Sequence, residues 1–177
     1  MKPGNLMLGA LLATTALLTA CSTGPGPLGT DSAWGSVCVP DVLGQPVADG
    51  MSVLYNHGTS PVRVTSVKLL SQRGLVMTEA WLVPTYKPPH GAWSYVGVQL
   101  YPPINWQTWP RRQPIPGAVI KPGQALNLVF GLSSTGPKDA HTGGSVITYT
   151  ANRTSYTLQE TFGFVLVAPH TRCPRAG

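Results

Sequence analysis

The chain has 177 residues, of which only 10% are charged, and it contains 20 Gly and 18 Pro. This composition argues against long solvent-exposed helices, which depend on Glu, Lys and Arg, and the length suffices for one domain with a sizeable core. The formal net charge is +6 and no carboxylate lies between Glu79 and Asp139, so the basic middle of the chain favours an anionic partner such as a membrane surface or an acidic cell-wall polymer.

The N-terminal segment is organised as a secretory signal. A basic start, Met1-Lys2, precedes an apolar stretch over residues 6–18 that holds no charge. As a helix this stretch would be roughly 20 Å long, too short for a hydrocarbon layer of roughly 30 Å. We therefore expect an export signal rather than a permanent membrane span.

The signal ends in Leu18-Thr19-Ala20-Cys21, which resembles the lipobox of bacterial lipoprotein precursors. The resemblance implies that Cys21 receives a diacylglycerol, that the chain is cut just before it, and that acyl chains such as palmitate then hold the protein on the outer side of the cell membrane. The alternative is an ordinary secretory signal that happens to be followed by a cysteine. Either address excludes nucleic acid as a partner.

This interpretation divides the chain into a signal peptide over residues 1–20, a tether over 21–35, a folded domain over 36–173 and a short tail over 174–177. The tether is expected because Gly, Pro, Ser and Thr dominate residues 22–30, and such segments cannot bury a core. It would hold the domain clear of the bilayer.

Two cysteines remain once Cys21 is assigned to lipid. Cys38 and Cys173 lie near the two ends of the expected domain, and outside the cytoplasm such a pair usually forms a disulfide. The alternative is a cysteine-based metal site or nucleophile.

Apolar residues alternate with a period of two along most of the chain, which predicts strands rather than helices. We expect strands over residues 36–40, 52–56, 62–70, 75–83, 95–101, 126–132, 145–151 and 156–167. The apolar phase slips between Val64 and Val67, which predicts a β-bulge near Thr65. Lys121-Pro122-Gly123-Gln124 predicts a type II turn, and Asn152-Arg153 predicts a hairpin connection. Seven or eight such strands indicate an all-β antiparallel sandwich, for which immunoglobulin-like topology is the commonest solution.

The segment from Pro84 to Pro116 is the candidate binding loop. It contains eight of the 18 prolines, and its flat aromatic rings and fixed cations suit sugar rings, acidic polymers or a partner protein. The candidate residues are Trp93, Trp106, Trp109, Arg111 and Arg112. The alternative is that these aromatic rings fold back and cap the sandwich.

Two further hypotheses concern chemistry. An envelope enzyme could assemble a site from Glu160, which breaks the apolar parity of its strand, and the four histidines: His57, His90, His141 and His170. A metal-binding protein could use the same histidines with Met51 or Met77. Because no histidine pair has metal-ligand spacing and no catalytic motif is present, the sequence favours a non-enzymatic binding or assembly module without a cofactor or a metal.

Overall fold

Thirteen strands make up the described part of the computed structural model, which covers residues 26–31, 35–41, 45–86, 94–169 and 171–173. The strands are β1 (Leu28–Thr30), β2 (Ser36–Pro40), β3 (Val47–Asn56), β4 (Val62–Leu69), β5 (Leu75–Pro84), β6 (Gly97–Leu100), β7 (Gln113–Pro114), β8 (Val119–Ile120), β9 (Ala125–Ser134), β10 (Ala140–Thr142), β11 (Ser145–Ala151), β12 (Thr154–Glu160) and β13 (Gly163–Val167). One 3-10 turn, η1 (Trp109–Arg111), interrupts them. The expected signal peptide, Cys21 and the tail lie outside the described residues.

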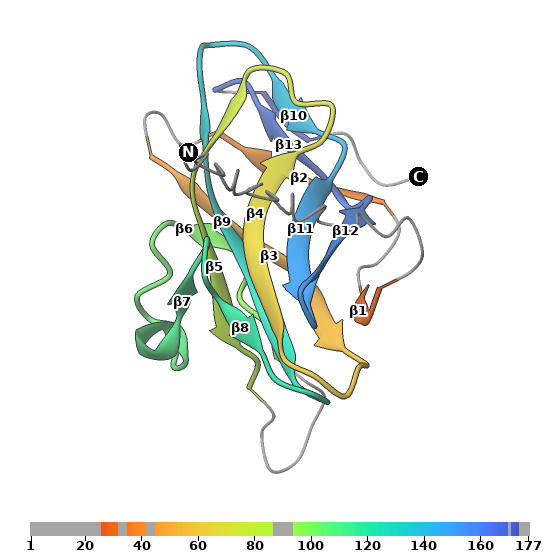
Figure 1. Ribbon diagram of the computed structural model, residues 1–177. Coiled ribbons are helices and arrows are strands. Elements are labelled where there is room, and N and C mark those ends of the chain that lie inside the picture. Colours follow the sequence, from red (N-terminus) through yellow and green to blue (C-terminus); the bar gives the residue numbers. More distant parts are fainter. Residues whose placement is uncertain (1–25, 32–34, 42–44, 87–93, 170, 174–177) are drawn as a thin grey trace, which may run out of the picture.

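The strands form an immunoglobulin-like β-sandwich. One sheet has the order β1-β3-β9-β5-β7, with β6 also paired to β3, and a second has the order β12-β11-β4-β8. The second sheet lies in front of the first in Figure 1, and a three-stranded sheet of β10, β13 and β2 continues the sandwich above it. Strand pairs are antiparallel except β2–β13, which is parallel. The main core lies between the sheets and takes residues from all three.

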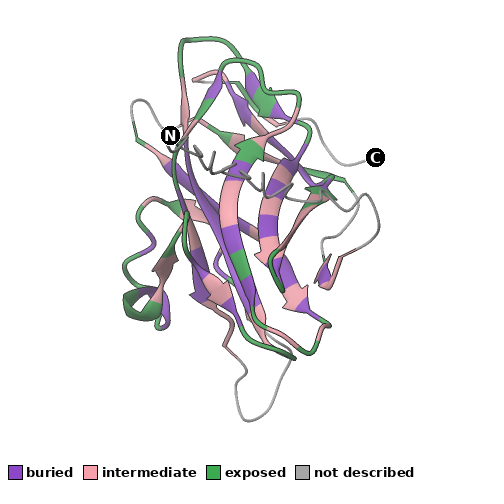
Figure 2. Cartoon of the chain, in the orientation of Figure 1, coloured by how far each residue is buried: buried purple, intermediate pink, exposed green. Residues whose placement is uncertain are grey.

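The predicted bulge on β4 is confirmed. Thr148 of β11 pairs with Ser66, whereas the next residue, Tyr149, pairs with Val64, so that Thr65 is the extra residue. The Thr65 hydroxyl donates to the Thr148 carbonyl oxygen at 3.0 Å. One added residue restores the inward direction of the apolar side chains, and burial alternates along β4 as a result (Figure 2).

Both predicted turns form. Gly123 has φ of +69° and the Gln124 N–H donates to the Lys121 carbonyl oxygen at 3.0 Å, as a type II turn requires. Asn152 and Arg153 have φ of +49° and +67° and join β11 to β12. Positive φ at both central residues matches the right-handed twist of the paired strands.

The single long strand predicted over residues 156–167 is wrong. The chain breaks after Glu160, and β12 pairs with β11 whereas β13 pairs with β10 and β2. The break has a local cause: Glu160 Oε1 accepts the Phe162 N–H at 2.6 Å, which turns the backbone out of the sheet that contains β11 and β12. The alternating pattern continues through the break because both strands face the same core.

The tether expected over residues 21–35 is wrong for residues 28–30. These residues form β1, which pairs with the end of β3, and Leu28 belongs to the main core with 4% of its surface exposed. Leu28 is the apolar residue of this Gly- and Pro-rich segment, and burying it outweighs the poor strand propensity of its neighbours.

The predicted pairing of Cys38 with Cys173 is present, with 5.8 Å between the Cα atoms and 135 residues between them in sequence. The bridge ties the end of the domain to β2. Among the described residues, no helix has the length and apolar character needed to cross a membrane.

Candidate functional site

The candidate binding loop folds onto the outer face of the six-stranded sheet. Ala48, Val83 and Val129 point to this face, because their neighbours Val47, Leu82 and Leu128 point into the main core. The loop, together with Trp81 of β5, covers them with an outer aromatic cluster, which consists of Trp81, Tyr101, Trp106 and Trp109 together with Arg112. Trp109 is buried at 5% exposed surface. The central strands are therefore buried on both faces, and the capping alternative describes this part of the loop.

Arg112 lies over two indole rings, which contact each other edge to face. Its guanidinium carbon lies 4.7 Å from the ring centroids of both Trp81 and Trp109. Its Nη1 donates to the Trp109 carbonyl oxygen at 3.2 Å, while its Nε is buried without a hydrogen-bond partner among the described residues. A cation close to two aromatic rings is attracted by both, so Arg112 joins the loop to β5.

A carboxylate completes the cluster at its exposed edge. Glu79 Oε2 accepts hydrogen bonds from the Tyr101 hydroxyl and from Trp81 Nε1. These bonds favour the charged form and lower the pKa of Glu79, the bond from Tyr101 contributing most. Burial, followed by the bond to Glu79, raises the pKa of Tyr101 to about 12. The hydroxyl therefore stays protonated and holds the loop to the sheet.

Four of the five predicted binding residues lie in the described part of the chain, and their surroundings differ from one another. Trp109 and Arg112 take part in packing, Trp106 is half-buried beside them, and Arg111 is exposed. Trp93 lies outside the described residues. Beside the cluster, residues 99–105 line a hollow of about 520 Å³, and Ile104 at its rim is 72% exposed.

Glu160 is buried at 2% exposed surface, where the chain passes from one sheet to the next. Besides the bond from the Phe162 N–H, its Oε2 lies 3.5 Å from the Ser145 hydroxyl. These contacts give the carboxylate a role in holding the corner between β12 and β13.

A second buried carboxylate, Asp49, was missed by the sequence interpretation. It lies on β3 at 6% exposed surface, and its Oδ1 accepts the Met51 N–H at 3.2 Å. Burial raises its pKa to about 7, the Met51 bond opposes this, and the negative charge of Glu160 adds to it. A single Asp in a segment of ordinary composition does not indicate from the sequence that its carboxyl group is buried.

The histidines of the enzyme and metal hypotheses do not converge. His57 precedes β4, whereas His141 pairs with Arg73, which follows β4. The eight residues of β4 separate the two by about 23 Å. Within the described ranges no three His, Cys, Asp or Glu side chains lie close enough to hold a metal ion. His90 and His170 lie outside those ranges.

A basic hollow at one end of the sandwich was also missed. It measures about 490 Å³ and is lined by Arg73, Pro137, Lys138, Asp139, His141 and Ala168. An adjoining hollow of about 320 Å³ shares Arg73 and residues 137–139. We call the two together the basic hollow. The sequence could not indicate it, because its cations come from separate loops that the sheet order brings together.

The basic hollow has a fixed backbone. Arg73 and His141 exchange N–H to carbonyl hydrogen bonds of 2.8 and 2.9 Å, so their side chains stand on the same face, about 5 Å apart at Cβ. The Asp139 carboxylate accepts the Ala168 N–H at 2.7 Å. One oxygen of the Asp139 carboxylate is therefore occupied by a hydrogen bond. The side chains of Arg73 and Lys138 are exposed and can contact an anionic ligand.

No protein family and no curated protein matches the chain. Among solved structures the chain is similar to the ASH/PapD-like domain of human CEP192 (PapD-like domain 7), at 11% sequence identity and a TM-score of 0.44. The similarity covers 90% of this chain and 98% of that domain.

Proposed function

We propose that the protein is a lipid-anchored, non-enzymatic binding module on the outer side of a bacterial cell membrane. The lipobox-like segment ending in Cys21 supports the anchor. The Cys38–Cys173 disulfide carries the proposal furthest, because such bonds persist outside the reducing cytoplasm and because it accounts for both other cysteines of the chain. Cys21 is then the thiol left for acylation.

The arrangement of polar groups supports binding rather than catalysis. Glu160 is buried at a strand break, and His57 and His141 lie at opposite ends of β4. General acid–base chemistry needs its groups within hydrogen-bond reach of one substrate. Exposed cations such as those of the basic hollow can bind an anionic ligand without meeting this geometric requirement.

The ligand of the module is an acidic cell-wall polymer, bound at the basic hollow. Arg73 and Lys138 place two positive charges beside a hollow that is open to a polymer chain. A phosphate or carboxylate group of the polymer would form charge-assisted hydrogen bonds with both. Poly(glycerol phosphate) is the probe for this step. The Arg73→Gln/Lys138→Gln variant should bind it about tenfold more weakly in titration calorimetry, while Lys68→Gln/Arg153→Gln, which removes the same charge elsewhere, should bind as before.

Fractionation of bacterial cells tests the anchor. The wild-type protein should remain with membranes after washing with salt and carbonate, whereas Cys21→Ser should be released in folded form. A Cys38→Ser/Cys173→Ser variant is the control, because it removes two thiols and leaves the lipobox intact. Membrane retention of Cys21→Ser through both washes would contradict the proposal.

A further inference from the structure

The contacts of Gly26 set an upper limit on the distance between the proposed anchor and the domain. Gly26 lies against the rings of Tyr149 and Tyr156. The Pro27 carbonyl oxygen then accepts the His57 N–H at 2.8 Å, and Leu28 enters the core. Gly26 is thus already in contact with the domain. From Cys21 to Gly26 there are five residue steps, which span at most about 18 Å in any conformation.

These contacts place the start of the domain at one end of the sandwich. Tyr149 and Tyr156 lie next to the turn at residues 152–153, and Pro27 lies beside Gly58 in the β3–β4 loop. That loop is joined to the turn at 121–124, because Asn56 exchanges backbone hydrogen bonds with Gly123 and Gln124. We call the segments 57–61, 121–124 and 152–153 the anchor-proximal end.

The opposite end is beyond the reach of the anchor segment. Strand β9 runs from the turn at 121–124 to the loop at 135–139, which lines the basic hollow. Its ten residues rise by about 30 Å, whereas the anchor segment spans at most about 18 Å. A lipid on Cys21 therefore keeps the anchor-proximal end close to the bilayer and leaves the basic hollow farther away.

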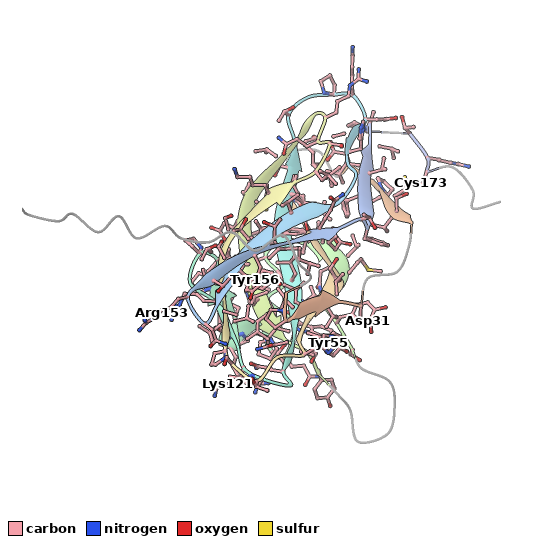
Figure 3. The ribbon with its side chains drawn as sticks, turned by 45° about the vertical axis from the view of Figure 1, so that its right-hand side comes forward. Asp31, Tyr55, Lys121, Arg153, Tyr156 and Cys173 are labelled. Carbon is pink, nitrogen blue, oxygen red and sulfur yellow. A yellow bond between two sulfur atoms is a disulfide. The ribbon has the colours of Figure 1, made fainter. Side chains whose placement is uncertain are left out.

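The charges of the anchor-proximal end suit a negative surface. Lys121 and Arg153 are both exposed, and Figure 3 shows them projecting from the end of the molecule that lies away from Cys173. The three segments contain no Asp or Glu. Cations at this position are attracted to the negative surface potential of an anionic leaflet.

We propose that the anchor-proximal end rests on an anionic lipid surface, with Lys121 and Arg153 against the headgroups and the basic hollow directed away from the membrane. The inference rests on the lipid anchor at Cys21 proposed above. It makes the protein a module of fixed orientation, because a short anchor and a basic contact surface act at the same end.

Quenching by lipid headgroups tests the orientation. The full-length lipidated protein is reconstituted in vesicles of three parts phosphatidylcholine to one part phosphatidylglycerol. It carries a dye on a non-natural amino acid at either Thr59 or Thr135, which are both exposed and lie at opposite ends. A nitroxide on the lipid headgroup should quench the dye at Thr59 severalfold and leave the dye at Thr135 unchanged. Equal quenching at both sites, or stronger quenching at Thr135, would overturn the orientation.

Removing the cations separates their role from that of the anchor. Lys121→Gln/Arg153→Gln should lose much of the quenching at Thr59 on anionic vesicles and little on phosphatidylcholine alone. Lys68→Gln/Arg172→Gln, with the same loss of charge at exposed positions outside the anchor-proximal end, should behave as the wild type. Undiminished quenching in the first variant would overturn the headgroup contact. Protein that fails to float with the vesicles would contradict the anchor itself, whereas protein that floats but is quenched equally at both sites contradicts only the orientation.

Discussion

Tyr149 and Tyr156 stack across the β11–β12 hairpin, with 5.4 Å between ring centroids and 18° between ring planes. The pair forms the surface on which Gly26 lies, and a Cβ atom on Gly26 would overlap the Tyr149 hydroxyl. Because Gly26 already contacts the domain, only the residues from Cys21 to Gly26 separate the proposed lipid from it. The position of the domain relative to the membrane therefore depends on this contact.

Gly26→Ala should destabilise the domain. The added methyl group has to displace a tyrosine ring or the first strand, and overpacking of this kind costs roughly 1–3 kcal/mol. Urea unfolding followed by tryptophan fluorescence measures the loss. Gly136→Ala is the matched control, since a Cβ there meets nothing within 4 Å. Equal stability of the Gly26→Ala variant and the wild type would show that residue 26 is not packed against the hairpin.

Asp49 should make the stability of the protein fall as the pH rises. The unfolded chain releases the Asp49 proton near pH 3.8, whereas burial raises the pKa in the folded protein to about 7. Between these values the unfolded state binds fewer protons, so stability decreases with increasing pH and levels off above about 7.

Asp49→Asn removes this dependence. Relative to the wild type, the variant should gain roughly 2–4 kcal/mol between pH 4 and pH 8. Thermal unfolding at the two pH values measures the gain, with the exposed Asp31→Asn as the control. A stability difference between Asp49→Asn and the wild type that is the same at both pH values would contradict a buried, protonated carboxyl group.

Much of the fold could be predicted because burial on one face leaves a visible period of two. The bulge at Thr65 follows from such a pattern, since a slip of phase has one simple structural solution. The first half of β3 was missed because residues 48–50 are buried on both sides, by the main core and by the outer aromatic cluster. Two-sided burial removes the alternation on which the prediction depends.

Asn127 should be important for stability. It is fully buried, donates through Nδ2 to the carbonyl oxygens of Gly50 and Ser52 at 2.9 and 2.7 Å, and accepts the Val96 N–H at 2.6 Å. The side chain thereby joins the irregular part of β3 to the segment before β6. Asn127→Ala leaves three buried backbone groups unpaired and should cost roughly 2–4 kcal/mol in urea unfolding. The exposed Asn105→Ala serves as the control and should cost less than about 0.5 kcal/mol.

Arg112→Met tests the capping role of the candidate loop. Losing a cation that packs over both Trp81 and Trp109 should cost roughly 1–3 kcal/mol and weaken the near-ultraviolet circular dichroism of the tryptophans. Arg111→Met, at the exposed neighbouring position, should change neither quantity. The same stability for the two variants would mean that the loop does not depend on Arg112 for its attachment.

The candidate site was harder to predict than the fold. Composition drew attention to Trp109 and Arg112, but an indole ring has the same sequence signal whether it binds a ligand or caps a sheet. Arg73 and Lys138 belong to different loops and His141 lies on β10, and the pairing of Arg73 with His141 brings them together. Long-range strand pairing of this kind cannot be read from local periodicity.

The proposed anchor and the proposed orientation both depend on Cys21 being the lipidated first residue of the mature protein. Mass spectrometry of the protein purified from bacterial membranes tests it most directly. We expect an N-terminal peptide that begins at Cys21, lacks residues 1–20 and carries the mass of a diacylglycerol on the cysteine. An N-terminal peptide with an unmodified Cys21, or a mature chain that begins at any other residue, would contradict it.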